Sequence, residues 1–252
     1  QESGIDLCTA EQRRDMCRKE MKLNKILAGK TYEDVIPVRK LRKETGNSEE
    51  AKTEVVDYAL KMRRLPEEKN LTVLLQQKYV TRDEVKTVAA VIARFHKKAR
   101  ILKNTFNVTK FQKEYEEILR CDDFVRDVFG EAFLGSINES IRISREFLSH
   151  YRYLIHQRTI GGFIREGHGN LSADKIFLDD KMVIMHRVVA NDDRRRVDVL
   201  FDIARLGVDL DYSDAKTLDK QFLAEYIHQF GDISDAKTGL LYTYYKMYHT
   251  GQ

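Results

Sequence analysis

The sequence predicts an α+β protein in which a small part with one helix and two strands precedes a larger, mostly helical part. Two β-like runs, residues 34–41 and 53–63, lie in the first quarter of the chain. From residue 71 onward, apolar residues recur at helical spacing over most of the sequence. Leu65-Pro66-Glu67-Glu68 interrupts both patterns. We therefore expect a domain boundary after residue 66, with parts 1–66 and 67–252.

Composition narrows the class of protein. The chain has 252 residues, of which 42% are hydrophobic and 33% charged, so it is too apolar for a disordered chain and too polar for a membrane protein. Its net charge of +4 is small for this length and argues against nucleic acid as a partner. No apolar run reaches the roughly 18 residues of a spanning helix, and no secretory signal opens the chain, so we expect no membrane association.

Cysteine usage bears on the compartment. Cys8, Cys17 and Cys121 are scattered and form no CxxC pair, so neither a disulfide framework nor a zinc ribbon is indicated. We therefore expect a cytoplasmic protein.

The small part begins with a predicted helix over residues 9–28. Thr9 is a suitable N-cap, Glu11 lies in the first turn, and Gly29 is a suitable stop. The runs 34–41 and 53–63 are separated by the polar segment 46–50, which predicts an antiparallel pair with a long loop.

The larger part is predicted as a series of helices. Thr81-Arg82-Asp83-Glu84 has the form of a capping box. A long helical stretch at 122–157 is expected to break near Gly130 or Gly135. The other predicted helices cover residues 71–77, 81–100, 108–119, 196–211, 215–229 and 236–249.

The least helical segment of the larger part follows Gly161-Gly162. Residues 163–171 carry His168-Gly169-Asn170 and are predicted as a loop. Two short β-like runs, 175–178 and 182–186, flank a turn-like polar tip at 179–181, which predicts a hairpin.

Six segments along the chain have the form of known family motifs. The first is a Cys-x-x-Glu-x-x-Leu-Asn helix. The segments are Cys17-Arg18-Lys19-Glu20-Met21-Lys22-Leu23-Asn24, Val35-Ile36-Pro37-Val38, Tyr58-Ala59-Leu60-Lys61-Met62-Arg63-Arg64-Leu65-Pro66, Ile92-Ala93-Arg94-Phe95-His96, His168-Gly169-Asn170-Leu171, and residues 196–210. Because these segments span nearly the whole chain, the sequence as a whole resembles the aminoglycoside phosphotransferase-like family.

This resemblance implies a two-lobed protein-kinase-like fold, with a small β-containing N-lobe, incomplete in this chain, and a larger helical C-lobe. It also implies nucleotide binding between the lobes and phosphoryl transfer by positioning and charge neutralisation. Family members pair a strand Lys upstream of the first helix with a helix Glu, for which Glu20 is the candidate. The chain starts too late to show that strand.

The sequence departs from the family pattern at three positions. In the loop His-Gly-Asp-Leu-x-x-x-Asn, the Asp orients the acceptor hydroxyl and the Asn binds metal, and a later Asp holds the metals. These positions are here Asn170, Lys175 and His186. An amide cannot take a proton, and loss of a base costs roughly 10²–10⁴ in rate. Ammonium and imidazole groups do not suit Mg²⁺, so we expect no magnesium cofactor, while ATP or phosphate could bind without metal through Lys175.

For several residues the sequence leaves a structural and a functional interpretation open. Glu20 is either a site residue or a solvated helix residue near Arg13, Lys19 or Lys22. His168 is expected to hold the loop by hydrogen bonds, and His186 to be a core imidazole. Two acids, Asp198 and Asp202, are expected to anchor the loop backbone. The tyrosines of the C-terminal helix are core residues or a surface for a protein partner; they are Tyr242, Tyr244, Tyr245 and Tyr248.

The leading functional hypothesis is a pseudokinase-like binding, scaffold or regulatory module with little or no phosphotransfer and with protein partners. One alternative is an active ATP-dependent small-molecule phosphotransferase, in which Asp174, Asp179 or Asp192 would lie close to His186. Another is an anion or nucleic-acid binder that uses Lys175, Arg187 and Arg194-Arg195-Arg196. Here the acids Asp192 and Asp193 would neutralise much of the arginines' field.

Overall fold

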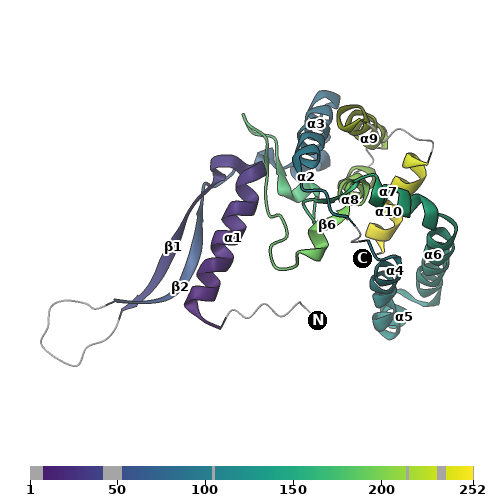
Figure 1. Ribbon diagram of the computed structural model, residues 1–252, viewed down its shortest axis with the longest axis horizontal. Helices are drawn as coiled ribbons and strands as arrows, with labels where there is room; N and C mark the ends of the chain where they lie inside the picture. The colour runs from purple at the N-terminus through teal and green to yellow at the C-terminus, as the bar shows by residue number, and fades with distance from the viewer. Residues whose placement is uncertain (1–7, 42–52, 104–105, 214–215, 232–236, 252) are drawn as a thin grey trace, which may run out of the picture. The chain divides into compact units, whose positions relative to one another are not determined.

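The computed structural model describes residues 8–41, 53–103, 106–213, 216–231 and 237–251 (Figure 1). Helices and small two-stranded antiparallel sheets make up the fold, so the predicted α+β class, with a small strand-containing part and a larger helical part, is confirmed. The chain divides into two compact units. Unit 1 comprises Gln1–Gln77 and Asp174–Asp192, and unit 2 comprises Lys78–Ala173 and Asp193–Gln252.

Unit 1 begins with helix α1 (Ala10–Ala28), as predicted. Thr9 caps it: the Thr9 side chain accepts from the Gln12 N–H, and the Gln12 side chain accepts from the Thr9 N–H. This reciprocal pair satisfies two backbone donors that a helix N-terminus leaves open. The helix ends at Gly29, whose φ of 52° suits a residue without a Cβ.

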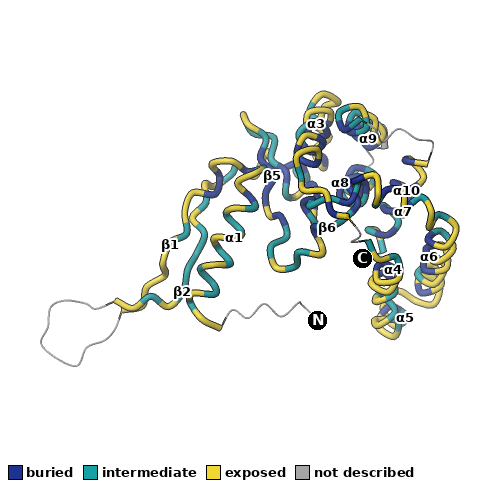
Figure 2. Tube along the Cα trace, viewed as in Figure 1, coloured by how far each residue is buried: buried dark blue, intermediate teal, exposed yellow. Residues whose placement is uncertain are grey.

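The strands β1 (Tyr32–Leu41) and β2 (Thr53–Met62) form the predicted antiparallel pair. The register places Val35 opposite Leu60 and Ile36 opposite Ala59. Most of β1 is exposed, whereas β2 is partly covered by α1 (Figure 2). The predicted polar loop at 46–50 lies outside the described residues.

The rest of unit 1 consists of short elements. Helix α2 (Leu71–Gln76) lies beside β4 (Ile176–Phe177), which pairs with β5 (Val183–Ile184) in the predicted hairpin. One hydrophobic cluster of the unit is formed by the buried residues Ala28, Tyr32, Val183 and Met185, with Met21, Leu60, Met62, Leu65 and Phe177 packed around them. The two compact units therefore do not meet at the boundary predicted after residue 66, because α2 and the β4–β5 hairpin belong to unit 1.

Unit 2 is built from helices. Thr81 and Glu84 form the predicted capping box of the first of them. Gly130, with a φ of 86°, separates α5 from α6, so of the two predicted break points Gly130 is the right one, and a second break falls at Tyr151. The helices are α3 (Arg82–Lys98), α4 (Val108–Glu116), α5 (Asp122–Phe129), α6 (Glu131–His150), α7 (Arg152–Ile160), α8 (Val199–Tyr212), α9 (Lys216–Phe230) and α10 (Thr238–Thr250).

Helix α8 is the most apolar of the central helices and lies in the interior of unit 2 (Figure 2). It packs against α9 and α10, and α3 packs against α9. The four tyrosines of α10 are all buried, so the core interpretation is the correct one for them. Because these rings lie inside the unit, they offer no surface to a partner.

A short strand pair in unit 2 was not predicted. Strand β3 (Ile164–Glu166) pairs antiparallel with β6 (Arg196–Asp198), so the predicted helix start at residue 196 is wrong. Helix α8 begins at Val199, where the Asp198 side chain accepts from the Leu200 N–H. Strands of three residues are too short for an alternating pattern to appear, which is why the sequence does not reveal them.

Candidate functional site

The His168-Gly169-Asn170 loop of unit 2 is held by the buried carboxylate of Asp202 on α8. The backbone N–H groups of His168 and Gly169 donate to the two Asp202 oxygens at 2.6 and 2.8 Å. Charged acceptors make such bonds short and strong. Asp202 therefore anchors the loop backbone, as the sequence predicted, whereas Asp198, the other predicted anchor, instead pairs with Arg158 and caps α8.

Two glycines let the backbone approach this anchor. A Cβ at Gly167 would lie 2.5 Å from the Asp202 Oδ2 atom, and one at Gly169 would lie 2.8 Å from the carbonyl oxygen of Arg194. Gly169 also has a φ of 85°, which side-chain-bearing residues rarely adopt. Both positions therefore require glycine.

The other side of Asp202 contacts His96 of α3. The His96 Nε2 atom lies 3.0 Å from Asp202 Oδ2, and its Nδ1 atom lies 2.7 Å from the Tyr226 hydroxyl of α9. Burial by itself would raise the pKa of Asp202, but hydrogen bonding and charge from His96 and His168 outweigh it and lower the pKa to about 2. Asp202 is therefore ionised at neutral pH inside the protein.

The sequence assigned no role to two residues of this network, His96 and Tyr226. His96 lies 106 positions before Asp202, and no local spacing connects the two. Its position on the apolar face of α3, beside Val88, Ala89 and Ile92, is the signal that indicates burial. A buried imidazole requires polar partners, but only the fold shows which residues supply them.

Asn170, at the predicted position of the catalytic acid, is exposed at the tip of this anchored loop. Its backbone N–H lies 3.3 Å from the Nδ1 atom of His168, whose side chain is fully buried. The Ala173 N–H donates to Asp209 at 2.7 Å, which fixes the end of the loop. The structure thus presents an amide on a tightly held backbone.

Lys175, at the first predicted metal position, belongs to unit 1. Its ammonium group forms an ion pair with Asp174, and its backbone oxygen accepts from the Met185 N–H at 3.0 Å. The Asn70 side chain donates to the Asp174 carbonyl oxygen at 2.9 Å. A positive charge therefore occupies the position where the resemblance implies a metal ligand.

His186, at the second predicted metal position, follows β5 and is exposed, so its expected role as a core imidazole is wrong. Its φ of 62° lies in the left-handed region, which is strained for a residue with a Cβ. Its N–H lies 3.4 Å from the hydroxyl of Tyr32. Desolvation and the charge of Lys175 lower the pKa of His186, against an opposing effect of Asp174, so the imidazole is neutral at pH 7.

Glu20 lies in α1 and is partly buried. Burial raises the pKa of its carboxyl group, and its charge contributes, after burial, to raising the pKa of Tyr32 to about 12. Of its expected basic neighbours, Arg13 pairs with Asp57 and Lys19 with Asp192. Among the described residues, no Lys, Arg or His side chain forms a salt bridge with Glu20.

The acids that could replace a metal ligand are paired with basic side chains. In unit 1, Asp179 lies 3.4 Å from Arg63, and Asp192 lies 2.9 Å from Lys19. Asp174 is the one of the three proposed acids whose charge acts on His186. Within the described part of the chain, no group of three His, Cys, Asp or Glu side chains is arranged to hold a metal ion.

The arginines considered for anion binding are held by protein groups. In unit 1, Arg187 is buried, and its guanidinium donates to the Leu23 carbonyl oxygen at 3.1 Å. In unit 2, the Arg195 guanidinium is buried and lies 3.4 Å from Glu166, and Arg196 lies 3.5 Å from Asp193. These contacts reduce the charge that the segment could offer to an anion.

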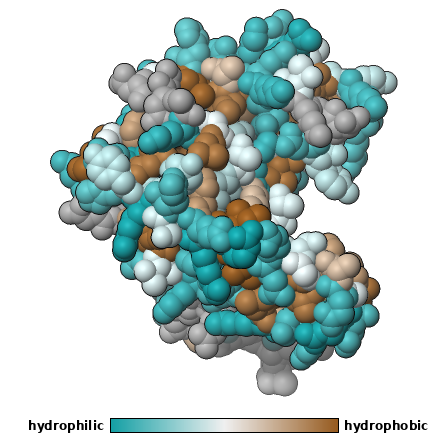
Figure 3. Space-filling model, turned by 90° about the vertical axis from the view of Figure 1, so that its right-hand side faces the viewer, coloured by the Kyte–Doolittle hydropathy of each residue, from teal (hydrophilic) through white to brown (hydrophobic). Residues whose placement is uncertain are grey.

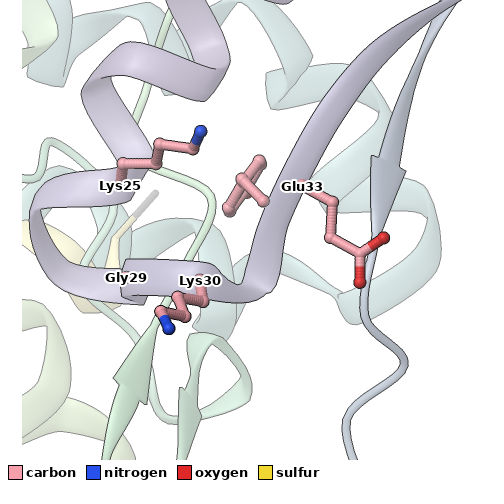
Figure 4. A pocket seen from close by; sticks show the side chains of 5 residues that line it. Lys25, Gly29, Lys30 and Glu33 are labelled. Atoms are coloured by element: carbon pink, nitrogen blue, oxygen red, sulfur yellow. The ribbon is translucent and has the colours of Figure 1, made fainter.

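Unit 1 also has an open cavity of about 480 Å³ where α1 ends and β1 begins. It is lined by Lys25, Gly29, Lys30, Tyr32 and Glu33. In Figure 4 the Glu33 carboxylate lies away from the two lysine ammonium groups, and it pairs with Lys61 at 3.0 Å. None of the predicted site residues lines this cavity.

Comparison with known proteins identifies relatives but no function. Three curated proteins, uncharacterized proteins of Mycobacterium bovis and of two strains of Mycobacterium tuberculosis, are each 28% identical to the chain over 246 residues. The match covers 96% of this chain and 47% of each relative, so the chain spans about half the length of the curated relatives it matches. No family model and no solved structure matches the chain.

The residues described contain no helix that is both long and apolar enough to cross a bilayer. Since the names of the mycobacterial relatives state no activity, the resemblance to the aminoglycoside phosphotransferase-like family stays a prediction.

Proposed function

We propose that the chain is a degenerate, pseudokinase-like member of the aminoglycoside phosphotransferase-like family that acts as a binding or regulatory module with little or no phosphotransfer. One observation carries this proposal. The loop of unit 2 is anchored by the buried carboxylate of Asp202 and, at its end, by Asp209, yet the residue that it exposes at the position of the catalytic acid is the amide Asn170. The loop's shape is independent of a proton acceptor at that position.

The residues at the proposed metal positions do not fit Mg²⁺. This ion prefers oxygen ligands in octahedral geometry, usually carboxylates and water. Lys175 offers an ammonium group that is already paired with Asp174, and His186 offers a neutral imidazole. We therefore derive no catalytic step that involves a magnesium ion, and we propose that any ATP or phosphate binds without metal.

The proposed partners are proteins rather than membranes or nucleic acids, and the proposed compartment is the cytoplasm. Cys17 and Cys121 form no disulfide within the described residues, which suits a reducing environment. The small net charge of +4 favours neither nucleic acid nor an anionic lipid surface.

An active phosphotransferase is the second candidate, because Asp174 is close enough to influence His186. If Asp174 left its ion pair with Lys175, its carboxylate could become a ligand or a base. In that case Asp174→Asn would abolish activity, whereas Asp180→Asn, a change at an exposed acid of the same unit, would leave it intact.

The test uses the full-length protein with ATP and Mg²⁺ and measures phosphate release and transfer. We expect a turnover rate well below about 1 s⁻¹, which is the low end of the range for kinases. Turnover on the order of 1 s⁻¹ that is lost in Asn170→Ala would overturn the proposal. Turnover of that size that is insensitive to both Asn170→Ala and Asp174→Asn would contradict the roles given to these two positions.

A gain-of-function variant tests the same proposal from the other side. Restoring the family residues in Asn170→Asp, Lys175→Asn and His186→Asp together should create Mg²⁺-dependent ATP binding, measured as a shift in melting temperature with and without Mg²⁺. The matched control adds Asp202→Asn, which weakens the loop's anchor. If the restored variant binds no metal nucleotide while remaining folded, the assignment of these positions is wrong.

A further inference from the structure

Four exposed apolar side chains of unit 2 lie next to one another where α5 meets α6. We call Phe124, Val128, Phe129 and Phe133 the aromatic patch. Their exposed fractions are 63%, 56%, 58% and 50%. The rings form a continuous row, because the centroids of Phe124 and Phe129 are 6.5 Å apart and those of Phe129 and Phe133 are 5.1 Å apart.

The local fold explains how these side chains reach the surface together. Val125 of α5 and Leu134 of α6 point inward and are buried, so the opposite sides of both helices face outward. Gly130, with its φ of 86°, turns the chain sharply between the helices. The last residue of α5 and the first turn of α6 thus lie side by side. Figure 3 looks onto the right-hand side of the view in Figure 1, where α5 and α6 lie, and shows apolar side chains among hydrophilic ones.

The size of the patch distinguishes it from ordinary surface apolar residues. Three phenylalanines that are each about half exposed present on the order of 300 Å² of aromatic surface. Single exposed apolar residues are normal, but a contiguous row with a polar rim is characteristic of an interaction site. Exposure of this area to water is unfavourable, and covering it would release that free energy.

The segment that carries the patch is acidic, and we call its carboxylates the acidic rim. Residues 122–133 contain the carboxylates Asp122, Asp123, Asp127 and Glu131 and the single cation Arg126. Arg126 is already paired with Asp123 at 2.7 Å and with Glu131 at 2.8 Å. The remaining negative charge repels an anionic lipid surface and attracts a basic segment.

The dimensions of the row fit a helix. The two ring separations together amount to less than 12 Å. Seven residues of an α-helix rise about 10.5 Å, so large side chains at i, i+3 or i+4, and i+7 would meet successive rings. Lysine or arginine residues flanking such an apolar face would lie near the acidic rim.

We infer that the aromatic patch is a docking site for a basic amphipathic helix of a partner protein. The acidic rim recognises the basic flanks of that helix, and the phenylalanine row binds its apolar face. This inference does not depend on the proposed function, because it uses neither the loop of unit 2 nor the residues around His186.

The experiment uses the full-length protein and a fluorescently labelled model peptide of about 14 residues, with leucines on one face and lysines on the other. We expect the peptide to bind with an affinity that falls as salt is raised. Phe129→Ser should weaken binding by about tenfold or more, because exposed aromatic anchors contribute much of such interfaces. The matched control, Tyr153→Ser, changes an aromatic residue of α7 that is 73% exposed and should leave affinity unchanged.

Charge is tested separately from apolar contact. Asp127→Lys should weaken binding of the lysine peptide and reduce its salt dependence, whereas a peptide with glutamates in place of lysines should bind the unmodified protein at least tenfold more weakly. Equal binding of the two peptides would contradict the recognition by charge. Hydrogen exchange should show protection by the peptide at α5 and at the start of α6.

Three results would overturn the inference. The first is failure of the lysine peptide to bind. The second is binding of the protein to phosphatidylcholine–phosphatidylserine vesicles, lost in Phe129→Ser, which would assign the patch to a membrane. The third is concentration-dependent dimerisation lost in Phe129→Ser, which would assign the patch to a second copy of the chain.

Discussion

The three predicted site positions lie in two segments that are held differently. Asn170 belongs to the loop at residues 167–171 in unit 2, and Lys175 and His186 belong to unit 1. In the loop, the polar groups that set the backbone point inward to Asp202, where each is hydrogen-bonded. Around His186, the altered side chains are exposed or partly exposed, and the backbone at His186 is strained. Buried residues can therefore hold the backbone of a loop in place even where the exposed residues that would perform the chemistry depart from the family pattern.

The largest expected effect comes from removing the anchor of the loop. Asp202→Ala would leave the buried N–H of His168 and the imidazole of His96 without their acceptor, and loss of a buried charged partner costs about 3–5 kcal/mol. Chemical denaturation should show this decrease in the free energy of unfolding. Asp180→Ala, at an exposed acid of unit 1, should cost less than about 0.5 kcal/mol. Similar losses in both variants would contradict the special role given to Asp202.

Acid pH should weaken unit 2 through His249 of α10. Burial lowers the pKa of His249 to about 4, although its hydrogen bond to the Phe201 carbonyl oxygen opposes this shift. Because the pKa of histidine in the unfolded chain is about 6.5, the unfolded state takes up a proton before the folded state does. The free energy of unfolding should therefore be fully retained above about pH 6.5 and should decrease by up to about 3 kcal/mol as pH falls toward 4. Unfolding free energies at several pH values should show this slope, and His249→Gln should flatten it. An unchanged slope in His249→Gln would exclude this assignment.

Asp202 should extend the acid sensitivity to lower pH. Because its folded-state pKa of about 2 lies below the unfolded value, its contribution is present above about pH 4 and disappears as pH falls through 2. The contribution amounts to about 2 kcal/mol. Asp202→Asn should remove the part of the pH dependence below pH 4 and leave the part from His249. If Asp202→Asn instead alters the slope between pH 4 and 6.5, the assignment to two groups is wrong.

An added methyl group should destabilise the loop at Gly169 but not helix α6 at Gly135. Gly169→Ala would place a Cβ 2.8 Å from the Arg194 oxygen at a φ of 85°, which should cost about 1–3 kcal/mol. Gly135→Ala in α6 meets no atom within 4 Å and should be neutral or stabilise the helix by about 0.5–1 kcal/mol. Melting temperatures of the two variants test this contrast. A neutral Gly169→Ala would show that the loop is not tightly held.

The smallest effect should appear in unit 1 and have the opposite sign. His186→Gly relieves a φ of 62° and should stabilise the protein by about 0.5–1 kcal/mol. The control His186→Ala removes the same imidazole without relieving the backbone, so it should not stabilise. Equal effects of the two variants, measured by denaturation, would show that the side chain and not the backbone decides the stability at this position.

The helices and strands could be predicted from short residue patterns, because the signals that begin and end them are local. Thr9 and Thr81 begin helices through capping boxes, and Gly29 and Gly130 end them through a positive φ. The α+β class and the β1–β2 pair follow from the same short-range patterns. Only the family resemblance distinguishes Asn170, Lys175 and His186 as candidate site residues, because no pattern of burial or spacing sets them apart.

Contacts between residues that are far apart in the chain could not be predicted and are visible only in the folded protein. His96, Asp202 and Tyr226 come from three helices and form one network, because a buried polar group must find its partners wherever packing brings them. Packing also buried the tyrosines of α10, exposed His186 and the aromatic patch, and paired β3 with β6. Short-range periodicity carries no information about such contacts, since they depend on the path of the whole chain rather than on neighbouring residues.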